Sequence, residues 1–155
     1  MADPLLVAAR ETLEESLDEI RSTIDGLTVE QLNDRAAGEG TNPVGVIVTH
    51  ALESTRAWLS IAVGAEPPPR DRPAEFRAVA DDAFPAWVDT RIAGCLALLD
   101  GAGPFDPSYE ARAPWRVTDA DTPVTAAWAL LHALAHLGEH VGHTHVMRDL
   151  LRVHR

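Results

Sequence analysis

Apolar side chains recur along this chain at steps of three and four residues, the spacing that puts them on one face of an α-helix. The pattern predicts four amphipathic helices, over residues 3–25, 42–64, 84–99 and 122–148. Three of them open on a polar capping residue followed by proline, which fits the first turn of a helix. We therefore expect an all-α protein, a four-helix bundle in which the first and last helices contribute most of the core.

The segments between these helices are polar or rich in proline and glycine, and none alternates long enough to require a sheet. Thr28 and Gln31 form a capping-box pair, which predicts a short helical segment, and a second one is expected over residues 74–80. Residues 102–121 carry prolines, charges and no sustained period. We expect a long irregular connection there, before the last helix, with room for a small strand pair near residues 109–117.

The last predicted helix carries five histidines, and four of them share one face. At about 100° per residue, steps of four, four and three keep His132, His136, His140 and His143 within an arc of roughly 80°, whereas His145 falls outside it. Apolar neighbours lie on or beside that face, so we expect the row to point into the interior. Neutral imidazole is the commonest metal ligand, and an i, i+4 pair on a helix can bind one ion.

A divalent metal site needs about three protein ligands, and the last helix supplies two of them through His136 and His140. His50 lies on the apolar face of the second predicted helix and is the only inward histidine outside the last one. We predict that these three bind one ion, with His132 and His143 either replacing a ligand or acting beside it. The identity of the ion stays open, because three imidazoles suit zinc, nickel, iron and copper.

The segment from His136 to His140 also reads H-x-x-E-H, the short motif of inverted zinc proteases in which the glutamate activates water. Under that interpretation Glu139 is the general base of a metal-dependent hydrolase. Those proteases take a further acidic ligand from well downstream, and only fifteen residues follow His140 here. We therefore keep the hydrolase as the lesser alternative.

Composition narrows the classes of function. The 155 residues, 46% of them apolar, suffice for one domain over residues 1–155, and Cys95, in an apolar pattern, is expected to be buried. A net charge of −11 with no basic stripe argues against nucleic acid as a partner. The chain shows no apolar run of membrane-spanning length and no signal-peptide pattern, so we expect a cytoplasmic protein with no membrane partner.

Two segments resemble the DinB-like metal-binding bundles, which include mycothiol-dependent maleylpyruvate isomerases and bacillithiol S-transferases. They are residues 41–52, TNPVGVIVTHAL, and residues 136–148, HLGEHVGHTHVMR. The likeness extends over nearly the whole chain and places the family's three metal ligands on His50, His136 and His140. It implies a DinB-like four-helix bundle that holds a divalent ion, zinc first and nickel or iron as alternatives, and that forms a homodimer. The extra C-terminal domain of the full-length isomerases has no counterpart here.

The resemblance implies a function as well. It implies a metal-dependent S-transferase or isomerase that acts with a low-molecular-weight thiol such as mycothiol. In this reaction the metal-bound thiolate attacks a small electrophile. Three neutral imidazoles leave the ion its full charge, which favours a thiolate near neutral pH. Beside the ligands, Glu139 and His143 are candidate catalytic groups, and Arg148 and Trp115 are candidate contacts to the thiol cofactor or the substrate. The alternative function is a metal-binding bundle without catalysis, stress-related or structural.

Overall fold

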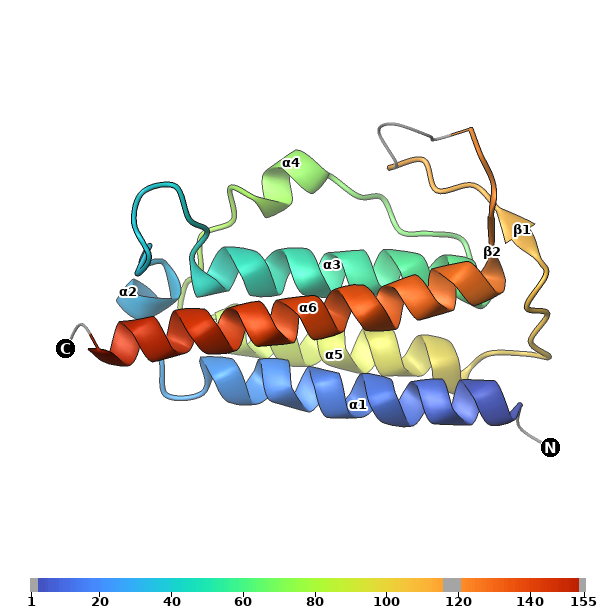
Figure 1. The fold of residues 1–155 in the computed structure, drawn as a ribbon, viewed down its shortest axis with the longest axis horizontal. Helices are drawn as coiled ribbons and strands as arrows, with labels where there is room; N and C mark the ends of the chain where they lie inside the picture. Colours follow the sequence, from blue (N-terminus) through green and yellow to red (C-terminus); the bar gives the residue numbers. More distant parts are fainter. Residues whose placement is uncertain (1–2, 116–120, 154–155) are drawn as a thin grey trace.

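Four long helices lie side by side in the computed structural model, which describes residues 3–115 and 121–153 (Figure 1). They are α1 (Pro4–Ile24), α3 (Val44–Ala62), α5 (Phe84–Asp100) and α6 (Ala126–Val153). Two single-turn helices, α2 (Val29–Leu32) and α4 (Arg72–Glu75), and a strand pair, β1 (Glu110–Ala111) with β2 (Val124–Thr125), complete the described part. The predicted all-α four-helix bundle is confirmed, and no helix in these two ranges is long and apolar enough to cross a bilayer.

Local sequence accounts for the ends of α1 and the start of α2. Asp3 caps α1, because its side chain accepts a hydrogen bond from the backbone N–H of Leu5 at 2.8 Å. The helix ends before Gly26, whose φ of +72° suits glycine. Thr28 and Gln31 form the predicted capping box, in which each side chain accepts the other residue's backbone N–H. Both partners of each bond lie within three residues, so the sequence alone predicts them.

Two elements start at other residues than the pattern predicts. The residue before α3 is Pro43, and no side chain caps this helix, so the capping role expected of Asn42 is wrong. The helical turn expected over residues 74–80 lies earlier, as α4, where the Asp71 side chain accepts the Ala74 N–H at 3.0 Å. The sequence signal for this turn is Asp71 followed two positions later by Pro73. The spacing of apolar residues does not reveal this signal.

The start of α6 is also later than predicted. Strand β2 pairs with β1 in antiparallel register, so one strand of the pair lies outside the region 109–117 in which a pair was expected. Thr125 then caps α6 by accepting the Trp128 N–H at 3.2 Å, the role predicted for Thr122. Pairing between segments distant in sequence does not change the helical spacing of apolar residues. The spacing therefore predicts too early a start for α6. The connection before α6 is irregular as expected, and residues 116–120 within it lie outside the described residues.

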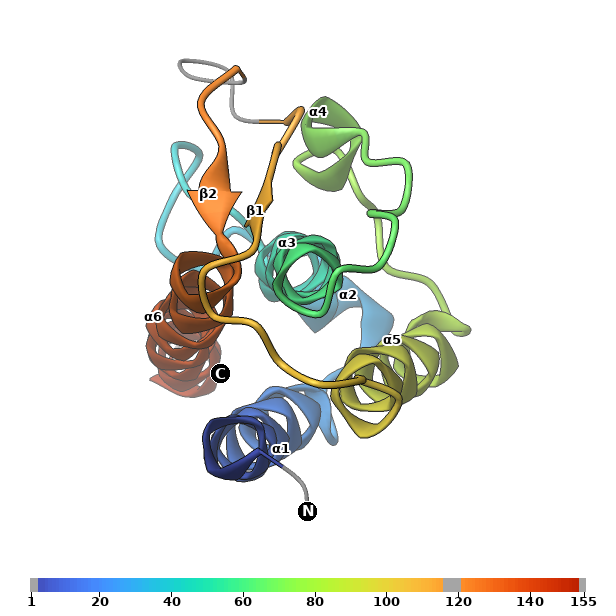
Figure 2. The same ribbon diagram turned by 90° about the vertical axis from the view of Figure 1, so that its right-hand side faces the viewer.

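The most buried helix is α3, which lies between the other long helices and the covering segment 63–83 (Figure 2). Sixteen of its 19 residues are buried, against seven of 21 in α1 and eight of 28 in α6. The expectation that the first and last helices supply most of the core is therefore wrong. A helix that is covered on all sides needs apolar residues all round, whereas α1 and α6 each keep a solvent face.

The direction of the helices explains the covering segment. Figure 1 shows that α3 and α5 run parallel, whereas α1 and α6 run the opposite way. The chain must therefore return along the bundle after α3, and the connection to α5, which includes α4, crosses the outer side of α3. The middle of α3 consequently lies between α6 and this connection.

Candidate metal centre

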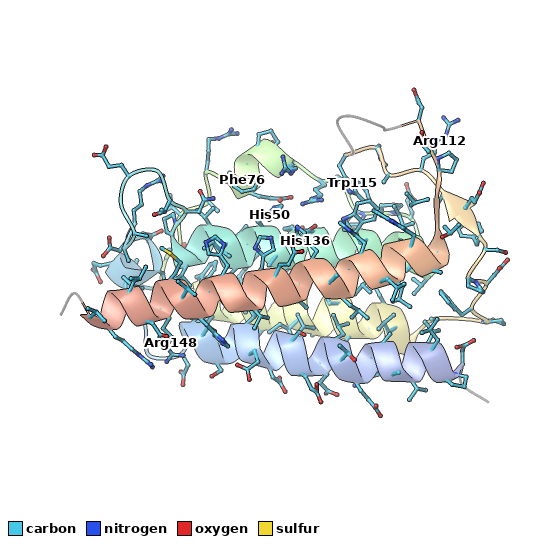
Figure 3. The ribbon with its side chains drawn as sticks, viewed as in Figure 1. His50, Phe76, Arg112, Trp115, His136 and Arg148 are labelled. Atoms are coloured by element: carbon cyan, nitrogen blue, oxygen red, sulfur yellow. The ribbon has the colours of Figure 1, made fainter. Side chains whose placement is uncertain are left out.

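His50 lies in the middle of α3 and is buried. The rings of His136 and His140, from α6, have their centroids 5.2 and 5.1 Å from that of His50, and both are turned edge-on to it. One ring nitrogen from each of the three lies within 4.8 Å of the others, and Figure 3 shows His50 and His136 close together between the two helices. The structure thus brings together the three histidines predicted as metal ligands.

The pair on α6 is spaced for one ion. The Nε2 atoms of His136 and His140 lie 3.3 Å apart. Two nitrogens bound at about 2.0–2.1 Å to one tetrahedral ion would lie roughly 3.3–3.4 Å apart, so the spacing fits. The helix itself sets this arrangement, because residues four apart stand one above the other on the same face. The three imidazoles therefore fit a divalent ion with one or two further positions for other ligands.

Both histidines of the pair are neutral at pH 7. Burial lowers the pKa of His136 to about 3, and repulsion from His140, His50, His132 and Arg70 adds to the shift. Burial likewise lowers the pKa of His140 to about 4, with a contribution from His50 and His143. Neutral imidazole is the form that binds metal, so protons do not compete for these nitrogens near neutral pH.

A buried glutamate completes the surroundings of His50, although no sequence motif indicates it. Glu75, the last residue of α4, accepts a hydrogen bond from Nδ1 of His50 at 2.7 Å, which leaves Nε2 of His50 for an ion. Arg70 donates to both oxygens of the same carboxylate, at 2.6 and 3.0 Å. Burial raises the pKa of Glu75, but the bonds from His50 and Arg70 outweigh it and hold the pKa below its ordinary value. On another side of the His50 ring, Phe76 packs with centroids 4.6 Å apart.

The histidine row continues from the triad into a group of tryptophans. His132 stacks on Trp128 with centroids 4.6 Å apart, and Trp58 from α3 meets these two rings edge-on at 4.8 and 5.3 Å. Trp115 lies edge-on against Trp58 at 5.3 Å, and the guanidinium of Arg70 lies 5.9 Å from its ring centre. His132 therefore packs among aromatic rings outside the ligand group, and Trp115 lies at the edge of the site.

The expectation that the histidine face points into the interior is only partly correct. The two candidate ligands on α6, His136 and His140, are half-buried, whereas His143 and Glu139 are exposed. His143 lies one turn beyond His140, with ring centroids 6.4 Å apart. His145 lies off this face, with Nε2 3.1 Å from a carboxylate oxygen of Glu19 on α1. Because α6 lies at the surface of the bundle, its apolar pattern does not predict how much of the histidine face other segments cover. The catalytic roles of Glu139 and His143 stay predictions.

Arg148 does not lie with the histidines. Its guanidinium donates to the backbone carbonyls of Ser22 and Asp25, at the C-terminal end of α1. Residue 148 is eight positions beyond His140, which turns it about 80° away from that histidine on the helix. Figure 3 shows it farther along α6, below the histidines. In the structure Arg148 is a cation at the C-terminal end of α1, and its contact with a thiol cofactor stays a prediction.

A groove of about 670 Å³ opens beside Arg70 and Trp115. Pockets for small ligands typically have roughly 300–1,000 Å³, so this groove is large enough to hold one. One wall is the proline-rich segment 66–70, and the other includes Arg112 and Pro114. The Nε1 atom of Trp115 is buried and has no hydrogen-bond partner in the part of the chain that the structure describes. Side chains connect the groove to the histidine triad, since Arg70, which lines the groove, bonds Glu75, and Glu75 bonds His50.

Comparisons with known proteins identify the family. A sequence model described as Mycothiol-S-transferase matches residues 8–152, which include all three histidines of the triad. Among solved structures, the "Crystal structure of the conserved protein of locus from Enterococcus faecalis" is similar with a TM-score of 0.71 and 18% identity, over 97% of this chain and 98% of that one. At this identity the likeness shows the fold alone. No curated protein matches the chain significantly.

The resemblance expected from residues 41–52 and 136–148 is confirmed by these matches. The family model spans both segments and nearly all of the chain between and around them. The chain therefore belongs to the mycothiol-S-transferase family.

Proposed function

We propose that the protein is a divalent-metal-dependent S-transferase that joins a low-molecular-weight thiol, mycothiol in the first place, to a small electrophile. The observation that carries the proposal is the triad of His50, His136 and His140, whose ring nitrogens lie within 4.8 Å of one another on facing helices. Membership of the family supports the thiol and the reaction class. Zinc is the first choice of ion, with nickel and iron as alternatives, because imidazole suits all three.

A divalent ion among three neutral imidazoles keeps its full charge and would lower the pKa of a bound thiol from about 8.5 into the neutral range. The thiol must come from outside, because Cys95, the single cysteine, is buried in α5 and burial raises the pKa of its thiol to about 12. Burial keeps His136 and His140 unprotonated, so both are ready to bind. Since these two rings are only half-buried, a thiol reaches the triad from their side.

In the proposed transfer, the thiolate sulfur forms a bond to an electrophilic carbon while the bond from that carbon to a leaving group, or to the oxygen of an epoxide, breaks. The oxygen of an opened epoxide takes up the proton that the thiol has lost, whereas a halide leaves as the anion and that proton passes to solvent. His143 and Glu139, both exposed on α6 near His140, are the residues that we propose hold this proton. The groove beside Trp115 and Arg70 is the proposed seat of the larger part of the thiol.

We also propose that the protein is cytoplasmic and forms a homodimer. Exposed apolar side chains on α6, such as Leu131 and Val146, support a contact between copies. Light scattering over a range of concentrations measures the mass in solution. A monomer at every concentration would end the dimer proposal without affecting the site.

Protein purified without a histidine tag tests the site. Elemental analysis gives the metal content, and conjugation of monochlorobimane with added mycothiol gives the activity. We expect His50→Ala, His136→Ala and His140→Ala to lose most of both. His145→Ala is the matched control, because this ring lies near Glu19 on α1, and it should keep both. A full metal content in His50→Ala would contradict the triad.

The same assay separates the alternatives. A full metal content in the wild type without turnover of any electrophile would favour a metal-binding bundle without catalysis. The hydrolase has less support, because the group of ligand atoms found among the described residues consists of three histidines and contains no acidic ligand of the kind that the inverted zinc proteases use.

A further inference from the structure

We propose that Glu75 and Arg70 form a positioning pair for the metal centre. Glu75 orients His50 and strengthens it as a ligand, and Arg70 offsets the charge of Glu75. The inference rests on the proposed function, because it needs an ion at the triad. Both residues come from the connection between α3 and α5 and not from the histidine motifs.

Charge-assisted hydrogen bonds join the three side chains into one chain. Nδ1 of His50 donates to Oε2 of Glu75 at 2.7 Å, and Arg70 donates from Nε to Oε1 at 2.6 Å and from Nη2 to Oε2 at 3.0 Å. The side chains of the arginine and the glutamate are only 4% and 5% exposed. A buried ion pair of this kind is expensive to desolvate and is weak evidence for stability, so its position beside a ligand points to a role at the site.

His50 differs from the other two ligands in having such a partner. The Nδ1 atoms of His136 and His140 are buried without a hydrogen-bond partner among the residues that the structure describes. A carboxylate on Nδ1 fixes the tautomer whose lone pair is on Nε2 and makes the ring a stronger base. The backbone of α6 alone aligns the i, i+4 pair, whereas the third ligand depends on Glu75 for its orientation.

Arg70 sets the charge of the centre. A divalent ion with three neutral imidazoles carries two positive charges, and the carboxylate of Glu75 alone would reduce this sum to one. The guanidinium of Arg70 adds one positive charge and returns the sum to two. Negative charge near the ion strengthens metal binding but makes a bound thiol less acidic, so the two members of the pair act in opposite directions. Glu75 therefore strengthens metal binding, and Arg70 keeps the pKa of a bound thiol low.

The first test compares Glu75→Gln with Glu53→Gln. Glutamine keeps an oxygen that accepts from His50 but removes the charge. Glu53 is a matched control, because it is also a glutamate with a side chain mostly buried in ion pairs, to Arg56 and Arg91, and not bonded to a ligand histidine. With Co²⁺ as the probe, we expect Glu75→Gln to lower the affinity about 10- to 100-fold and to change the visible absorption spectrum. Glu53→Gln should change thermal stability and leave both Co²⁺ readouts as in the wild type.

The second test separates the two members of the pair. Arg70→Gln should bind Co²⁺ at least as tightly as the wild type. With cysteine as the probe thiol, the pH midpoint of the thiolate-to-cobalt absorption band should rise by roughly half a unit or more. Arg70→Lys keeps the charge and should restore the midpoint. If Glu75→Gln does not fold, Glu75→Asp, with its shorter reach to His50, takes its place and should weaken Co²⁺ binding.

The outcomes distinguish this inference from the proposed function. A wild-type protein that binds no Co²⁺ would overturn the proposed function itself. If the wild type binds Co²⁺ and Glu75→Gln binds it with the same affinity and the same spectrum, the positioning role alone would be overturned. Equal losses of Co²⁺ affinity in Glu75→Gln and Arg70→Gln, with no shift of the thiol midpoint, would reduce the pair to a structural ion pair.

Discussion

Acid should destabilise the metal-free protein through His136 and His140. In the folded protein, burial lowers their pKa values to about 3 and about 4. In the unfolded chain an imidazole titrates near 6.5, roughly the model-peptide value. Below that pH the unfolded chain therefore binds two protons that the folded protein excludes. The stability that these groups contribute is present above pH ~6.5 and is lost as the pH falls from there toward the folded pKa values.

The magnitude follows from the unfolded pKa, because both histidines are still neutral in the folded protein at pH 5. One pH unit corresponds to about 1.4 kcal/mol for each proton, and the pH lies ~1.5 units below 6.5. Without screening, each histidine would contribute about 2 kcal/mol to the loss between pH 7.5 and pH 5. Because both rings are only half-buried, solvent screening lessens the shifts, and we expect about 3 kcal/mol for the pair. A domain is typically stable by about 5–15 kcal/mol, so the effect is large enough to measure.

Urea unfolding of protein stripped of metal, followed by far-ultraviolet circular dichroism at pH 7.5 and pH 5.0, measures the change. Other groups titrate over the same range, so the wild type is compared with His136→Gln/His140→Gln, which lacks the two imidazoles. We expect the wild type to lose about 3 kcal/mol more than this double variant. His145→Gln, which removes a ring near Glu19 of α1, should keep the wild-type pH dependence. Equal losses in the wild type and the double variant would refute the argument that burial keeps the pair neutral.

Three further predictions concern the metal, the end of α1 and a matched pair of glycines. Zinc at about 100 times its dissociation constant should stabilise the wild type by about 2.7 kcal/mol, and a chelator should remove that gain in thermal unfolding. Arg148→Ala should lower the free energy of unfolding by about 1–2 kcal/mol, because carbonyls at the end of α1 lose a charged donor, and metal content by elemental analysis should not change. Gly45→Ala should destabilise by about 1–3 kcal/mol in urea, because its Cβ would lie 3.0 Å from the carbonyl oxygen of Leu32 and 3.2 Å from Cβ of Ala80. Gly142→Ala, where nothing lies within 4 Å of the new Cβ, should instead stabilise by about 0.5–1 kcal/mol, and equal effects at the two glycines would contradict the close approach at Gly45.

The parts of the fold that the sequence predicts are those that depend on neighbouring residues. The four long helices follow from apolar spacing, and the capping box of Thr28 and Gln31 from two residues three apart. The parts it does not predict depend on contacts between distant segments. Strand β2 occupies what looks like the first turn of α6, and α3 becomes the central helix only because of what covers it. Neither contact changes the local period of apolar residues.

The same division holds at the site. His136 and His140 are predictable because the helix puts residues four apart on one face, and His50 because it is the one inward histidine on another helix. Glu75 could not be predicted, because it belongs to a single turn of helix in a segment without apolar period. Arg148 shows the converse, since it lies on the same helix as His136 and His140, yet its side chain bonds the end of α1.

The direction of the helices explains why the segment that carries Glu75 passes the middle of α3. Two antiparallel helices can be joined by a few residues, yet 21 residues separate Ala62 from Phe84. Such a length fits a parallel pair, because the chain must return along a helix of 19 residues, which at about 1.5 Å per residue spans roughly 28 Å. A returning segment has to cross the middle of the helix it leaves. Charged residues near its midpoint, as Arg70 and Glu75 are, therefore become candidates for contact with whatever polar group that helix carries at its centre, which here is a histidine.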